Sequence, residues 1–289
     1  MATNLSSVVR NWQHRWRAIR TIEKRNSQAT FFSIGIYITV AVALFSAALA
    51  LNNTVRSTDQ NDALVALQPL SFAAIFLCTA LVSIYIALTS ALSASRERDL
   101  GTLEVLFYGP VDEASFVLGK FLAQVKVYAV VSLIVLVWTN VITWLLNIAF
   151  SLDTVFVLLT SIFVASAVIA FGLMVAMIGG KARSALIAFI VTVLVLVGLQ
   201  IADVVVTTAI QIPENATLTD PVLVIRTALG VINSVVRWIS PYAQLQLGMD
   251  ALAQGVVPSY LFHVGITIIQ TVIMLVISIL VLRKKGARG

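Results

Sequence analysis

The chain has 289 residues, of which 60% are hydrophobic and 11% are charged, and its mean hydropathy is +0.99. Soluble domains carry roughly 25% charged residues, so this composition excludes a water-soluble core. The net charge of +6 does not indicate a nucleic-acid partner, because the basic residues lie at the ends of apolar segments and form no stripe interleaved with aromatic residues.

Residues 1–30 are basic and amphipathic. Trp12, Trp16 and Ile19 fall on one face of a helix, and arginines that include Arg17 and Arg20 surround them. This pattern predicts an interfacial helix that places its indole rings in the headgroup layer and its basic side chains against anionic membrane lipid. The alternative is a basic flank that only precedes the first membrane span.

Apolar stretches recur along the rest of the chain. A helix needs about 20 apolar residues to cross the hydrocarbon core of a bilayer. The sequence therefore predicts an all-α polytopic membrane protein, a single domain over residues 1–289, with transmembrane helices at about 31–51, 69–93, 121–147, 154–178, 184–211 and 258–282.

The loop between the second and third spans, residues 94–119, is a charged exit followed by a short amphipathic helix, which we expect over residues 97–108 with Leu100, Leu103, Leu106 and Phe107 on one face. Pro110 ends this helix, and Asp112 can cap the next one, which runs through Gly119 and Lys120 into the third span. On spacing alone the loop is either a docking element for a cytoplasmic partner or a solvated connector.

The order of residues in this loop is specific. Arg-Glu-Arg-Asp-Leu-Gly-Thr-Leu-Glu at 96–104 is followed by Pro110 and then by Leu-Gly-Lys at 118–120. This pattern resembles the signature of ABC-2 type transporter permeases, and the chain is most similar to the gliding-motility and copper-maturation permeases.

The resemblance implies a permease subunit of an ATP-binding cassette transporter, with export as the expected direction. Its partners would be an ABC ATPase subunit, which binds ATP and Mg²⁺, and a second copy of the permease or a homologous permease. The short helix would be the coupling helix, with its apolar side chains in a groove of the ATPase and its carboxylates on basic residues at the rim. The residues assigned to this coupling are Glu97, Asp99, Gly101, Thr102, Leu103, Glu104, Leu106, Phe107 and Pro110, with Gly119 and Lys120 at the base of the third span.

The segments after the fifth span complete the predicted topology. Residues 212–257 are expected to form short or re-entrant helices on the outer side, because the apolar stretch at 222–239 contains Arg226, Asn233 and Arg237. Most of the 19 basic residues then share one side, at the N-terminus, in 94–126, in the turn at 181–183 and in the tail. The positive-inside rule places both termini in the cytoplasm of a cell-membrane protein.

No catalytic, cofactor or metal site is predicted in this chain. The sequence Gly119-Lys120 is followed by Phe121 and is no phosphate-binding loop, so ATP hydrolysis is assigned to the partner. Asp203 falls near the outer surface, where we expect an interfacial acid. Two other functions remain open: a membrane scaffold for a cytoplasmic partner, and a secondary carrier, which would need mid-membrane ionisable residues that are largely absent. The cargo is not identified.

Overall fold

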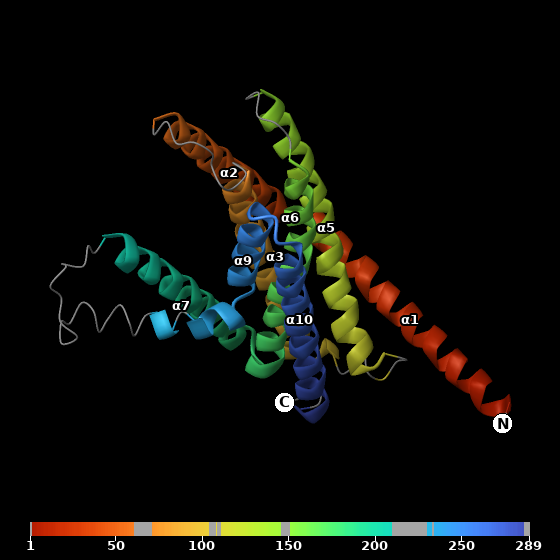
Figure 1. Cartoon of the computed structure of the whole chain (residues 1–289). Coiled ribbons are helices and arrows are strands. Elements are labelled where there is room, and N and C mark those ends of the chain that lie inside the picture. The colour runs from red at the N-terminus through yellow and green to blue at the C-terminus, as the bar shows by residue number, and fades with distance from the viewer. Residues whose placement is uncertain are drawn as a thin grey trace, which may run out of the picture.

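The computed structural model describes residues 2–60, 71–103, 108, 111–145, 151–209, 230–232 and 234–285, with the backbone alone at 2–14, 54, 56–60, 197–209 and 285. The long elements of this part of the chain are all helices (Figure 1). They are α1 (Ala2–Phe31), α2 (Ile34–Gln60), α3 (Phe72–Asp99), α5 (Glu113–Leu145), α6 (Leu152–Gly179), α7 (Ala182–Ala209), α9 (Pro241–Ala253) and α10 (Val257–Lys285).

Five of these helices are long and apolar enough to cross a membrane, namely α2, α3, α5, α6 and α10. They correspond to five of the six predicted spans. The sixth prediction, 184–211, falls on α7, whose apolar stretch among the described side chains, Ala182–Leu196, is shorter than a bilayer crossing.

The predicted loop at 94–119 is shorter in the structure. α3 continues to Asp99 and α5 already begins at Glu113, so 100–112 alone separates the two helices. The predicted start of the coupling helix at Glu97 is therefore wrong, because Glu97, Arg98 and Asp99 form the last turn of α3. Below, the basal end of the bundle means the end where α3 and α10 finish and α5 begins, which is the lower end in Figure 1.

α6 lies at the centre of the bundle and packs against α3, α5, α7, α9 and α10. Small side chains allow this, since a Cβ atom added at Gly172 would lie 2.6 Å from the backbone oxygen of Ala87 in α3. Close backbone approach gives helices the dispersion contacts that hold them together where lipid removes the hydrophobic driving force.

Hydroxyl groups add a second kind of contact between the helices. Each pair joins two different helices or their caps, at 2.6–3.1 Å: Ser71 with Thr154, Ser83 with Tyr242, Tyr128 with Ser161, and Thr160 with Tyr260. Such a bond contributes about 0.6 kcal/mol in a membrane protein, so the pairs fix the register of the helices more than they stabilise the bundle.

α9 begins in the middle of the bundle. Tyr242 in its first turn contacts Ser83, near the midpoint of α3, whereas Met249 near its end lies beside Phe72, at the start of α3 and far from the basal end. Ser240 accepts a hydrogen bond from the backbone N–H of Ala243 and so caps α9. α9 thus lies within the segment 212–257, for which short or re-entrant helices on the outer side were predicted, and that placement stays a prediction; residues 210–229 lie outside the described part.

Close packing of α3 on α6 predicts that Gly172→Ala destabilises the protein by about 1–3 kcal/mol, because the new methyl group must displace backbone. The midpoint of thermal unfolding in detergent measures this. Gly265→Ala is the matched control, since a Cβ at Gly265 meets nothing within 4 Å; an equal effect of the two substitutions would contradict the packing argument.

Candidate functional site

α3 ends at a turn that requires glycine. Gly101 has φ +68, a left-handed conformation that side chains with a Cβ disfavour. A Cβ there would meet nothing within 4 Å, so the glycine is needed for its backbone and not for close approach of a partner. Thr102 donates a hydrogen bond from its hydroxyl to the carbonyl of Glu97, at 2.8 Å, which satisfies an exposed carbonyl of the last turn.

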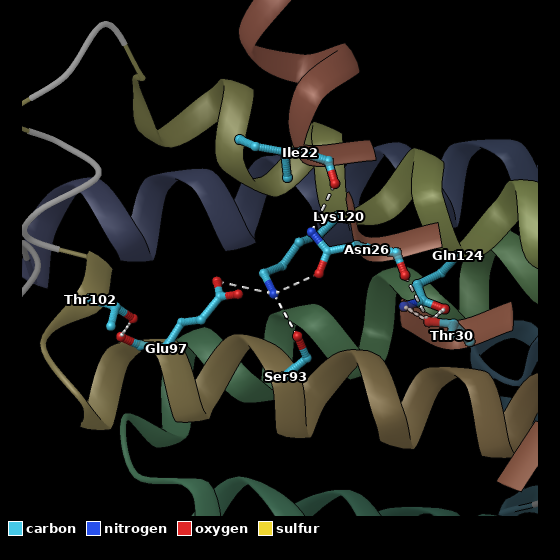
Figure 2. A network of polar contacts seen from close by, with 8 residues as sticks. All are labelled: Ile22, Asn26, Thr30, Ser93, Glu97, Thr102, Lys120 and Gln124. Carbon is cyan, nitrogen blue, oxygen red and sulfur yellow. Dashed lines mark hydrogen bonds and ion pairs between the residues drawn. The ribbon is translucent and has the colours of Figure 1, made fainter. Parts of the chain in front are cut away.

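A buried ion pair joins α3 to α5 at this end. Lys120 is 2% exposed, and its Nζ lies 3.1 Å from Oε2 of Glu97 and donates to Oγ of Ser93 at 2.7 Å (Figure 2). Asn26 of α1 supplies Oδ1 at 3.5 Å, and the Phe116 ring lies 5.3 Å below the ammonium group. Three helices therefore share one charge.

α1 packs along the first turns of α5 beside this pair. A Cβ at Gly119 would lie 2.9 Å from the Cβ of Ile22, so glycine at this position lets the two helices touch. One turn further along, Gln124 donates to Oγ1 of Thr30 at 3.1 Å. In the Leu-Gly-Lys motif, Gly119 therefore makes the α1–α5 contact and Lys120 makes the ion pair. A second ion pair, between Lys126 and Glu23 at 2.8 Å, joins α5 to α1 at the surface.

The two residues after Glu97 reach two further helices. Arg98 is buried and donates from Nη1 to the carbonyl of Met177 at 2.8 Å, near the end of α6. Oδ2 of Asp99 accepts the backbone N–H of Ala182 at 2.8 Å, the first residue of α7, where a carboxylate also meets the positive end of the helix dipole. The carboxylates of Glu97 and Asp99, expected on the rim of a partner, are engaged within this chain.

The apolar residues of the turn separate into two groups. Leu103 is 1% exposed and belongs to the basal core with Phe116 and Leu282. Leu100 and Tyr108 are 76% and 90% exposed. The predicted side chains of Glu104, Leu106, Phe107 and Pro110 lie outside the described residues.

The side chains predicted to form one interfacial face of α1 differ in their exposure. Ile19 is buried, at 9% exposure, whereas Trp16 is 48% exposed, and Arg17 and Arg20 are exposed. The side chain of Trp12 lies outside the described residues. Contact of α1 with headgroups stays a prediction.

Metal chemistry finds no support in the described side chains. No group of three His, Cys, Asp or Glu lies close enough there to hold a metal ion. His263 instead forms a hydrogen bond between Nδ1 and Oε1 of Gln244, at 2.7 Å. The side chain of Asp203 lies outside the part that is described.

The comparison with protein families identifies the family of the chain. The family model described as ABC-2 family transporter protein matches residues 27–287. The chain belongs to the ABC-2 transporter family. A search of curated proteins found no match. As an ABC-2 permease, the chain is the membrane component of an ABC transporter, a component that works with an ABC ATPase subunit and generally lacks an ATPase site of its own.

The signature residues of this ABC-2 permease thus form a junction between helices. Glu97 reaches α5 through Lys120, which also contacts Asn26 of α1, Arg98 reaches α6, and Asp99 reaches α7. Sequence analysis identified these residues but not their partners, and it placed Leu100 on the same face as Leu103. It did not single out Tyr108, and no periodic signal in the sequence marks that residue as exposed.

The Glu97–Lys120 pair predicts an asymmetry between its two members. Glu97→Gln leaves a fully buried ammonium group without its counterion, whereas Lys120→Met leaves a carboxylate whose side chain is 26% exposed and reaches water. We expect Glu97→Gln to destabilise by about 3 kcal/mol and Lys120→Met by less. Chemical or thermal unfolding in detergent measures both, and the double variant should recover part of the loss. Equal losses would argue against a buried, shared charge.

Proposed function

We propose that this permease is an exporter in which a separate ATPase subunit moves the bundle through residues 100–112. The observation that carries the proposal lies at the end of α3. The side chains of Glu97, Arg98 and Asp99 contact three other helices, and the next residue, Leu100, is exposed. A force on Leu100 would therefore reach α1, α5, α6 and α7 directly, because this residue adjoins the three side chains that make these contacts.

This mechanism refines the role of a coupling helix. Leu103, buried in the basal core, anchors the segment to the bundle, and among the residues of 100–112 that the structure describes, Leu100 and Tyr108 are the exposed apolar side chains available to a partner. Exposed apolar and aromatic side chains on a surface turn are typical anchors of protein interfaces. In this proposal the ATPase binds ATP and Mg²⁺, and ATP shifts the permease because the ATP-bound motor prefers one arrangement of the bundle.

The proposal includes the topology and the assembly. α7 crosses the membrane as a sixth span, which keeps the N-terminus and the tail together in the cytoplasm, as the placement of the basic residues favours. α9 and the segment before it form a re-entrant pair on the outer side. A second copy or a homologous permease completes the pore, and the resemblance of the loop supports a relationship to the gliding-motility and copper-maturation permeases.

Replacement of the two exposed anchors tests this function. Leu100→Ser with Tyr108→Ser should weaken association with the ATPase about 30-fold, the effect of losing roughly 2 kcal/mol at an interface hot spot. Ile178→Ser, which replaces an apolar residue that is 48% exposed at the basal end of α6, is the matched control. The measurements are copurification with the ATPase and vanadate-sensitive ATP turnover in proteoliposomes.

The outcomes separate the possible functions. Loss of association and turnover in the double variant, with an unchanged unfolding midpoint, supports the coupling role. Unchanged association and turnover would contradict it. A wild-type chain that binds the ATPase without affecting its turnover would indicate a membrane scaffold.

A further inference from the structure

An apolar cavity of about 240 Å³ lies where α9 begins, between α6, α7 and α10. Its walls are almost entirely hydrocarbon, with Thr192 and Ser240 as the hydroxyl-bearing residues. The residues that line it are Val168, Phe171, Met174, Thr192, Val193, Leu196, Ile239, Ser240, Pro241, Tyr242 and Met274.

Around this cavity the carbonyls of Arg237 and Trp238 and the hydroxyl of Thr192 have partners, whereas Oε1 of Gln270, which is not among the lining residues, is buried without one. The helical segment before α9 ends at Ser240, and a helix end normally leaves backbone carbonyls without intrahelical partners. Here Gln270 donates to the carbonyl of Trp238 at 2.6 Å, and Gln244 donates to the carbonyl of Arg237 at 2.5 Å. Thr192 donates its hydroxyl to the carbonyl of Ala188 at 2.8 Å.

Water is therefore a poor occupant of the cavity. A buried water needs two to four polar partners, and apolar cavities of about 150 Å³ stay dry and take up apolar molecules instead. An unfilled cavity would also be destabilising, by about 24 cal/mol for each Å³. The site selects for hydrocarbon.

The surroundings of the cavity supply hydrocarbon. On α7, the neighbours Val191, Leu194 and Val195 are 51%, 64% and 53% exposed, and Ile239 beside the break is 56% exposed. In a membrane protein such side chains contact acyl chains. The depth agrees, since Tyr242 in the cavity wall contacts Ser83 near the midpoint of α3.

We propose that this cavity is a binding site for the acyl chain of a bilayer lipid, which enters between α6 and α7. None of the lining residues is charged, so the site takes the hydrocarbon tail and leaves the headgroup outside. The inference does not depend on the direction of transport or on the ATPase contact.

Photolabelling of the full chain in vesicles tests the site. The probe is a phosphatidylcholine with a diazirine in one acyl chain, and the adducts are located by mass spectrometry. We expect adducts at Phe171, Met174 and Met274. A phosphatidylcholine with the diazirine in its headgroup should not label these residues.

Two variants fill the cavity from opposite walls. Val193→Phe on α7 and Met274→Phe on α10 should each reduce the acyl adducts in the cavity several-fold. Leu194→Phe, which adds a ring to the bilayer-facing side of the same helix, should leave them unchanged. Labelling confined to outward residues such as Leu194 and Val195, or equal cavity labelling in all variants, would overturn the proposal. A second copy of the chain seated over the cavity would exclude the probe and leave only the outward residues labelled, a result that would likewise overturn the proposal.

Discussion

The ammonium group of Lys120 is the constraint on which the basal end of this permease depends. It is buried among α1, α3 and α5, and a buried charge is tolerated only where a counterion and further polar groups surround it. Glu97, Ser93 and Asn26 supply these groups from two other helices. The three helices must therefore meet at one register, and Gly119 permits it by letting α1 touch α5.

The rest of the bundle is held by close packing of small and apolar side chains and by hydroxyl pairs. Above the base, small residues and hydroxyl pairs join α3, α6, α9 and α10, while α7 leans away from the other helices toward its far end (Figure 1). The apolar cavity lies on the side where α7 diverges.

Sequence reasoning predicted the apolar spans and the junction's residues, but it missed the contacts. Charged residues after an apolar run were interpreted as a loop, although buried partners let α3 continue through Glu97 to Asp99. The helical face drawn through Leu100 and Leu103 was wrong, because the left-handed turn at Gly101 breaks the period. The sequence of one helix does not show which neighbouring helix its charged residues contact. The partners of Arg98 and Asp99 could therefore be identified only from the folded structure.

Locking α1 to α5 tests the central claim, that these helices move as one body at the base. Glu23→Cys and Lys126→Cys, in a Cys78→Ala background, place two thiols where the ion pair stands, and a short bismaleimide joins them. We expect the cross-linked protein to retain ATP turnover with its ATPase, because in the proposed coupling the contact between α1 and α5 stays closed during turnover. Loss of activity on cross-linking, reversed when either cysteine is omitted, would contradict the account.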